Sequence, residues 1–166
     1  MHQILLAEDS QFSVRDLTRK LRAWDEAYEL TVVRDGQAAI DMLDPASETR
    51  MQPAPDLIIL DLKMPRVDGL EVLGFIRETP GLHDLPVVVL TTSDSPFDMD
   101  LADVLQVNDY LVKGADANTV CRILAKHSRR RAPRLGTSGP SPSIGAGPAD
   151  PGPLEPEFAP GPRREP

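Results

Sequence analysis

The sequence predicts an α/β fold in which five parallel strands form one sheet and helices cover both of its faces. Short, entirely apolar runs alternate with segments of helical periodicity, in the order βαβαβαβαβα, over roughly the first 128 residues. The run at residues 57–60 has four apolar residues in succession, which is typical of a strand buried on both faces of a parallel sheet. Strict alternation of this kind favours right-handed crossovers and a doubly wound sheet.

Composition indicates a soluble chain without a membrane anchor or a disulfide. Of the 166 residues, 40% are hydrophobic, and no apolar run approaches the length of about 18 residues that crosses a bilayer. The amino terminus lacks the basic and apolar regions of a signal peptide, so we expect a cytoplasmic protein with no membrane contact. The single cysteine, Cys121, excludes an internal disulfide. A net charge of -8 argues against direct binding to DNA, whose phosphates would be repelled.

The expected strands are the apolar runs at residues 3–7, 28–33, 57–60, 87–90 and 107–112. The acids Glu8 and Asp9 follow the first run, and Asp61 follows the third. The fourth run ends in a cluster of hydroxyl side chains that begins at Thr91, and the fifth ends at Lys113. Polar groups are therefore expected where several of the strands end.

The expected helices follow these strands. Ser10 is a suitable N-cap for the first, whose face carries apolar residues three or four apart, at Val14, Leu17, Leu21 and Trp24. The second and third begin after turns at Asp35-Gly36 and Asp68-Gly69, and the fourth begins at Ser95-Pro96, where proline suits the first helical position. The later helices are expected at residues 38–43, 70–77, 95–105 and 115–127.

From residue 132 onward the composition changes abruptly. This stretch has ten prolines and six glycines among its 35 residues, with few large apolar side chains. Such a segment buries too little surface to offset the entropy lost on ordering. We therefore expect a folded domain at residues 1–131 and a disordered, proline- and glycine-rich tail at 132–166.

The carboxyl ends of parallel strands meet at one edge of a sheet, so the polar residues at these ends are expected to face a common point. They are three acids, one hydroxyl and one amine: Glu8, Asp9, Asp61, Thr91 and Lys113. Clustered carboxylates repel one another unless a cation is present, and oxygen ligands of this kind suit Mg²⁺. Such a metal polarises a phosphoryl group, and a carboxylate next to the phosphorus becomes an acyl phosphate.

At these residues the sequence resembles the receiver domain of two-component response regulators, over roughly residues 1–128. The resemblance lies in LAED at residues 6–9, LDLKMPRVDG at 60–69, VLTTS at 89–93 and YLVK at 110–113. It implies a flavodoxin-like, CheY-like (βα)5 sheet with strand order 2-1-3-4-5. The chain looks most similar to the single-domain regulators that partner phytochrome-type histidine kinases, which implies a role in light signalling.

The resemblance also implies a role for each matching residue. Asp61 would accept a phosphoryl group from the phosphohistidine of a histidine kinase. Glu8, Asp9, Asp61 and the backbone carbonyl of Lys63 would hold Mg²⁺, while Lys113 would pair with the phosphate. The protein would then be a phosphoacceptor in a phosphorelay, with at most slow self-dephosphorylation, and not an enzyme.

A switch is implied as well. Thr91 would bond a phosphoryl oxygen and move toward it, so that Tyr110 turns inward and reshapes the face formed by segments 95–105, 107–112 and 115–127. Crowded apolar residues on the first of these segments motivate a homodimer through that face. One departure is that Gly114 follows Lys113 where most receivers have a proline.

Two alternatives to a phosphorylated receiver remain at this point. A small-molecule phosphatase or phosphotransferase with an aspartyl nucleophile usually has a second acid two residues on, where this chain has Lys63, and a substrate cap that is absent here. A pseudo-receiver that binds partners without phosphorylation is disfavoured, because every acid and the lysine are present.

Overall fold

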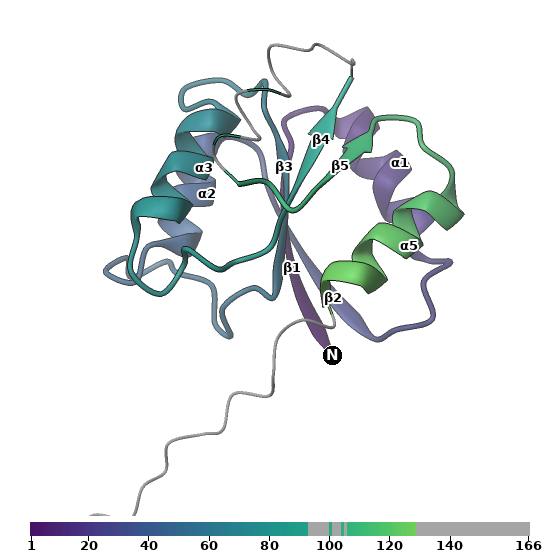
Figure 1. Ribbon diagram of the computed structural model, residues 1–166, viewed down its shortest axis with the longest axis horizontal. Coiled ribbons are helices and arrows are strands. Elements are labelled where there is room, and N and C mark those ends of the chain that lie inside the picture. Colours follow the sequence, from purple (N-terminus) through teal and green to yellow (C-terminus); the bar gives the residue numbers. More distant parts are fainter. Residues whose placement is uncertain (93–99, 101–103, 105, 129–166) are drawn as a thin grey trace, which may run out of the picture. The chain divides into compact units, whose positions relative to one another are not determined.

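The computed structural model describes residues 1–92, 100, 104 and 106–128 (Figure 1). All of them belong to one compact unit. The tail expected at 132–166 lies outside the described residues, as does the helix expected at 95–105 apart from residues 100 and 104. The domain boundary and the disorder of the tail therefore stay predictions.

The five described strands form one parallel sheet. They are β1 (His2–Ala7), β2 (Tyr28–Val33), β3 (Leu57–Asp61), β4 (Val87–Thr91) and β5 (Asp109–Val112). Their order across the sheet is β2-β1-β3-β4-β5, which confirms the flavodoxin-like order. Ala7 pairs with Leu60, Asp61 with Leu90 and Thr91 with Val112, so the strands end nearly level with one another. Their carboxyl ends thus form one edge.

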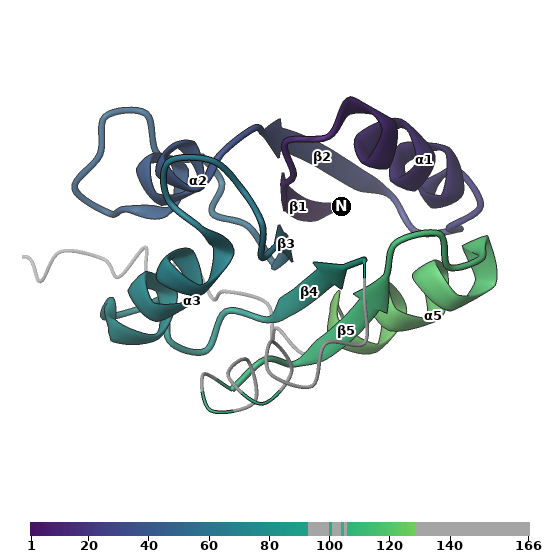
Figure 2. The same cartoon turned by 90° about the horizontal axis from the view of Figure 1, so that it is seen from above.

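Helices cover both faces of the sheet, as the alternation of strands and helices predicts. Figure 2 shows α1 (Gln11–Leu21) and α5 (Ala117–Ser128) on one face, and α2 (Gly36–Leu43) and α3 (Gly69–Glu78) on the other. Alternate strand residues point to opposite faces. In β3, Ile59 packs with α1 and α5 while Ile58 and Leu60 pack with α2 and α3. Burial on both faces explains why these strands are apolar throughout.

Several element boundaries differ from those expected. Helix α1 ends at Leu21, so Trp24 is not on its face but in the turn that follows, where it stacks between His2 and Tyr28. Helix α2 begins at Gly36, because the side chain of Asp35 accepts a hydrogen bond from the backbone of Ala38 and caps the helix. Strand β5 is shorter than expected, and α5 begins two residues later. None of the described helices is both long and apolar enough to cross a bilayer.

Candidate functional site

The carboxyl edge of the sheet brings together the acids that the sequence predicts to meet. Glu8 directly follows β1, Asp9 comes next, and Asp61 is the last residue of β3, the neighbouring strand. One carboxylate oxygen from each of the three lies within 4.8 Å of the others. Glu8 and Asp61 are buried, at 0% and 4% exposure, whereas Asp9 is exposed. The cluster is therefore open to solvent on the side of Asp9.

Lys113 places a positive charge against two of these acids. Its Nζ atom lies 2.7 Å from Oε2 of Glu8 and 2.9 Å from Oδ2 of Asp61. The backbone amide of Lys113 donates to the carbonyl of Thr91 at 2.7 Å, which continues the pairing of β4 and β5 by one residue. The strand ladder thus fixes the point from which the lysine reaches across to β1 and β3.

Burial and pairing shift the pKa values of Glu8 and Lys113 in the same direction. Burial raises the pKa of Glu8, and the nearby charge of Asp61 adds to this, against the lowering effect of bonds from Lys113 and Ser10. Burial acts to lower the pKa of Lys113, but its hydrogen bonds and ion pairs with Glu8 and Asp61 outweigh burial and raise it. The lysine thus stays charged. Three carboxylates against this one ammonium leave the cluster with an excess of negative charge.

The loop after β3 is held tightly around Asp61. The backbone amide of Lys63 donates to Oδ1 of Asp61 at 3.2 Å, and that of Gly69 donates to the carbonyl of Leu62 at 3.0 Å. A Cβ atom at Gly69 would lie 2.2 Å from the carbonyl oxygen of Asp61, so only glycine permits this close turn. Asp68 then caps α3 through a capping box with Glu71. Asp61 is therefore held at both carboxylate oxygens, at Oδ1 by the amide of Lys63 and at Oδ2 by Lys113.

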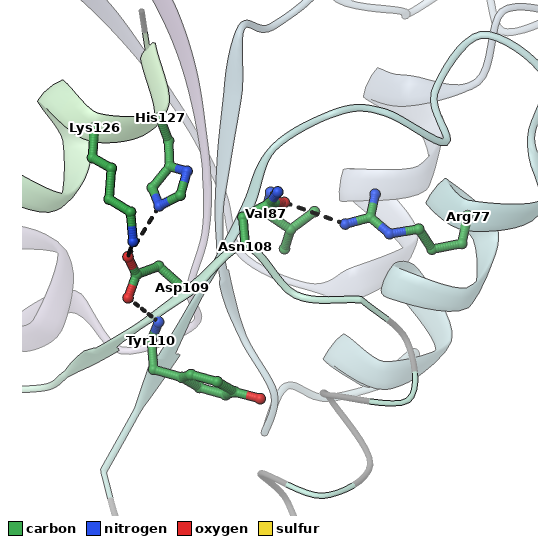
Figure 3. A network of polar contacts seen from close by, with 7 residues as sticks. All are labelled: Arg77, Val87, Asn108, Asp109, Tyr110, Lys126 and His127. Carbon is green, nitrogen blue, oxygen red and sulfur yellow. Dashed lines mark hydrogen bonds and ion pairs between the residues drawn. The ribbon is translucent and has the colours of Figure 1, made fainter. Parts of the chain in front are cut away.

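A small cavity of about 140 Å³ lies beside the cluster. Five of its lining residues are predicted site residues, namely Asp9, Asp61, Lys63, Thr91 and Lys113. Leu62 and Thr92 also line it and were not predicted as site residues. Tyr110 is not among the described lining residues. It lies on β5, where its backbone amide donates to Oδ1 of Asp109 at 3.0 Å (Figure 3). The structure therefore gathers the predicted site residues except Tyr110, and their individual roles stay predictions.

The donor set fits a divalent cation of the hard type. Carboxylate oxygens are the ligands that Mg²⁺ prefers, usually one or two from protein with water completing the shell. The cluster supplies three such groups, and one oxygen of each lies within 4.8 Å of the others. Lys63 lines the same cavity, so the loop whose carbonyl is the predicted fourth ligand lies beside the acids. The acids and their excess charge therefore suit Mg²⁺.

Sequence reasoning did not find the contacts that hold the loop after β3 from outside. The guanidinium of Arg66 pairs with Asp35, at the start of α2, and a Cβ atom at Gly36 would lie 2.1 Å from the carbonyl oxygen of Val67. Asp35-Gly36 was visible as a turn, and Arg66 was visible inside the motif of the third strand. Local sequence patterns do not indicate a contact between Asp35 and Arg66, because these residues are 31 positions apart in the chain.

Known proteins resemble this chain over the same region. The family model described as the response regulator receiver domain matches residues 4–125. Response regulator Rcp1 of Synechocystis sp. (strain ATCC 27184 / PCC 6803 / Kazusa) is 40% identical over 121 residues, which cover 73% of this chain and 82% of Rcp1. The transcriptional regulatory protein CpxR of Escherichia coli (strain K12) is 35% identical over 128 residues, but the match covers only 49% of CpxR.

Solved structures agree with this relation. The Mn(2+)-bound form of Rcp1 matches with a TM-score of 0.70 and 37% identity, over 80% of this chain and 98% of that one. The phosphorylated cyanobacterial phytochrome response regulator RcpA matches with a TM-score of 0.70 and 34% identity, over 79% and 96%. With the family motif, the sheet order and the cluster of acids all in place, the chain belongs to the family of response regulator receiver domains.

Proposed function

We propose that this receiver accepts a phosphoryl group on Asp61 from the phosphohistidine of a histidine kinase, in phosphorelay signalling. The observation that carries the proposal is the contact of Lys113 with both Glu8 and Asp61, inside a cluster of three carboxylates at the open edge of the sheet. A lysine in this position neutralises a phosphoryl oxygen as readily as it neutralises a carboxylate. Lys113 is thus placed to neutralise part of the added negative charge when Asp61 becomes phosphorylated.

In the proposed step a carboxylate oxygen of Asp61 attacks the phosphorus. The bond from phosphorus to the histidine nitrogen breaks, and the imidazole of the kinase leaves with the electron pair. Glu8, Asp9, Asp61 and the carbonyl of Lys63 would hold Mg²⁺, which would supply charge neutralisation for the phosphoryl oxygens. Lys113 then pairs with a phosphoryl oxygen.

Relatives support the choice of metal and of partner. One solved relative is a Mn(2+)-bound form of Rcp1, and another is a phosphorylated phytochrome response regulator. We propose Mg²⁺ as the physiological ion and a phytochrome-type histidine kinase as the phosphodonor, acting in the cytoplasm. We also propose a phosphoacceptor and not an enzyme that turns over a small substrate, because receivers act as the target of the phosphoryl group.

The test is incubation with acetyl phosphate and Mg²⁺, followed by intact mass. The wild type is expected to gain one phosphoryl group, and Asp61→Asn is expected to gain none. Asp41→Asn is a matched control, because Asp41 is an exposed carboxylate on α2 that bonds to Gln37. An adduct that persists in Asp61→Asn contradicts the assignment, and a wild type without any adduct supports a pseudo-receiver instead.

The output is proposed to be a change of the face that includes β5 and α5, with Thr91 and Tyr110 as the switch. Thr91 lines the cavity beside Asp61, and Tyr110 lies on the next strand. Apolar side chains are exposed at Val112 of β5, at 48%, and at Val104, at 75%. Two exposed side chains do not by themselves form a patch, so the proposal of a homodimer through this face rests on the apolar residues of segment 95–105.

Light scattering tests the dimer. We expect twice the mass of the chain at high protein concentration, and a shift of the equilibrium when beryllofluoride is added as a phosphoryl mimic. Val112→Glu places a charge on the exposed side chain and is expected to give a monomer. A wild type that stays monomeric in both conditions removes the homodimer.

A further inference from the structure

We propose that Arg66 and Asp35 form a clamp that holds the loop at residues 62–68 in the conformation needed for metal binding. Both are positioning residues, since neither is among the acids of the cluster. The inference rests on the proposed Mg²⁺ site and adds a pair of residues that act on it through the backbone. The pair connects the loop after β3 with the turn after β2, two segments that lie on either side of the end of β1.

Arg66 has a backbone that its side chain does not favour. Its φ is 69°, in the left-handed region that glycine and asparagine occupy most readily. An arginine there needs a compensating interaction, and its guanidinium pairs with Oδ2 of Asp35. Although 67% of the Arg66 side chain is exposed, only 7% of the Asp35 side chain is, so the pair is anchored at its buried end.

The carboxylate of Asp35 is oriented by a contact that does not involve Arg66. Its Oδ1 atom accepts a hydrogen bond of 2.9 Å from the backbone amide of Ala38 as the N-cap of α2. This bond orients the carboxylate and leaves Oδ2 for the guanidinium of Arg66. A buried carboxylate needs such a partner. The arginine therefore binds a rigid acceptor and not a mobile surface acid.

The turn and the loop also touch through their backbones. A Cβ atom at Gly36 would lie 2.1 Å from the carbonyl oxygen of Val67, so the start of α2 packs directly against the end of the loop. The loop is held at its ends by the bonds of Lys63 to Asp61 and of Gly69 to Leu62. Arg66 and Val67 hold its outer part. The loop is thus fixed at three places.

The clamp connects two sources of metal ligands. The backbone amide of Glu8 donates to the carbonyl of Val33 at 3.1 Å, two residues before Asp35. The turn that binds Arg66 therefore continues from the strand that binds Glu8. On the other side, the loop that Arg66 belongs to follows Asp61 directly and contains Lys63. Loss of the clamp is expected to loosen the loop while the three carboxylates stay in place, and so to weaken Mg²⁺ binding.

Two variants remove the pair with little other change. Arg66→Gly keeps the left-handed backbone without strain but removes the guanidinium. Asp35→Asn keeps an oxygen to cap α2 but removes the charge that binds Arg66. Arg19→Ala is the control, because it removes an exposed arginine that pairs with Asp16 on α1. An exposed pair of that kind contributes little to stability.

The first measurement needs no metal. In hydrogen exchange of the metal-free protein, we expect faster exchange of peptides that cover residues 62–69 in Arg66→Gly and Asp35→Asn than in the wild type and Arg19→Ala. Exchange in Asp35→Asn equal to that of the wild type overturns the clamp, because glycine at position 66 loosens the loop backbone by itself. Because no ion is present, this result does not depend on whether the proposed function is correct.

The second measurement is Mg²⁺ binding by titration calorimetry. Residues bonded directly to a ligand side chain change metal affinity by roughly 10- to 100-fold, so a pair that acts through the backbone is expected to weaken binding by about three- to tenfold. Arg66 and Asp35 act as one pair, so losing both is expected to lower Mg²⁺ affinity no further than losing the more important of the two. Unchanged affinity, or effects that simply multiply, overturns the proposal. A wild type that binds no Mg²⁺ overturns the proposed metal site, and with it the link from clamp to metal.

Discussion

Partly buried charged groups lie at the carboxyl ends of the strands (the carboxyl edge) and at their amino ends (the amino edge). The two edges pair these charges in different ways. At the carboxyl edge, Glu8, Asp9 and Asp61 crowd against the ammonium of Lys113. At the amino edge, a single carboxylate, Asp109, accepts hydrogen bonds at Oδ2 from Lys126 at 2.8 Å and from His127 at 3.0 Å (Figure 3). Three acids crowd one lysine at the first edge, whereas at the second edge two donors converge on the carboxylate of Asp109.

The amino edge also contains an arginine that donates to several neutral oxygens. Arg77, near the end of α3, donates to the carbonyls of His83, Leu85 and Gln106, at distances of 2.8 to 3.0 Å. It also reaches Oδ1 of Asn108 at 3.4 Å. The same oxygen accepts the backbone amide of Val87, at the start of β4 (Figure 3). Arg77 therefore ties α3 to the chain before β4 and before β5.

This difference separates a site that binds a ligand from a network that stabilises the fold. Polar groups that bond to one another stabilise the structure without a ligand, and at the amino edge His127 is bonded through Nε2 while its buried Nδ1 has no hydrogen-bond partner among the described residues. Like charges held close together cost free energy, which a bound cation or a phosphoryl group with its metal recovers. Neutralising one carboxylate is therefore expected to stabilise the protein at the carboxyl edge and to destabilise it at the amino edge.

Arg77→Ala is expected to have the largest effect on stability. It leaves several carbonyl oxygens without a donor, which is expected to lower the free energy of unfolding by about 2 to 4 kcal/mol. Urea denaturation at neutral pH measures it. Arg19→Ala removes an arginine with 75% of its side chain exposed and is the control, with an expected change near zero. A loss below about 1 kcal/mol for Arg77→Ala would mean that water replaces the guanidinium.

Asp9→Asn is expected to stabilise the metal-free protein. The Asp9 carboxylate is exposed and close to two other acids, so removing its charge relieves repulsion of about 1 kcal/mol, or a few degrees in Tm. The same variant is expected to lose most of the rise in Tm that Mg²⁺ gives the wild type, because a metal ligand is missing. Thermal unfolding with and without Mg²⁺ measures both effects. A variant less stable than the wild type without metal contradicts the repulsion.

Much of the carboxyl edge is predictable from the sequence, and little of the amino edge is. Apolar runs that end in Glu8, Asp61 and Lys113 predict parallel strands, and parallel strands end together. The ion pair of Asp109 with Lys126 and the bonds of Arg77 depend on how helices of given length return to the sheet. Periodicity placed the start of α5 and the start of β5 two residues too early.

Asp109→Asn is expected to destabilise the protein in a pH-dependent way. Burial acts to raise the pKa of Asp109, but hydrogen bonds from Lys126 and His127 outweigh burial and lower it. A carboxylate with a lowered pKa in the folded state stabilises that state above its unfolded pKa of about 3.9, and this contribution is lost as the pH falls through the folded pKa. The variant is therefore expected to be less stable than the wild type at pH 6, with a gap that closes below about pH 4.

Urea denaturation between neutral and acidic pH measures this gap. Asp41→Asn, on the exposed side of α2, is the control and is expected to show no comparable pH dependence. A gap that stays constant down to pH 3 would mean that the Asp109 contacts act through shape and not through charge.

Lys63 is expected to have the smallest effect, on the lifetime of the phosphorylated state and not on stability. Lys63 lines the cavity beside Asp61, and opposite charges there attract by about 1 to 4 kcal/mol before screening. An ammonium at the mouth of the site stabilises phosphoaspartate or displaces the attacking water, because a long side chain is better placed to block a water than to orient it. An exposed pair of about 0.4 to 1 kcal/mol corresponds to roughly a two- to fivefold slower decay.

Phosphoaspartate decay in Lys63→Asn and Lys63→Met tests this shielding. Both variants are expected to lose the phosphoryl group faster than the wild type, since neither retains the ammonium. Lys126→Met is the control, because it removes a lysine at the amino edge, where the charge pairs with Asp109. Decay that is unchanged or slower in the Lys63 variants contradicts shielding, and a slower rate would assign Lys63 to stabilising the hydrolytic transition state instead.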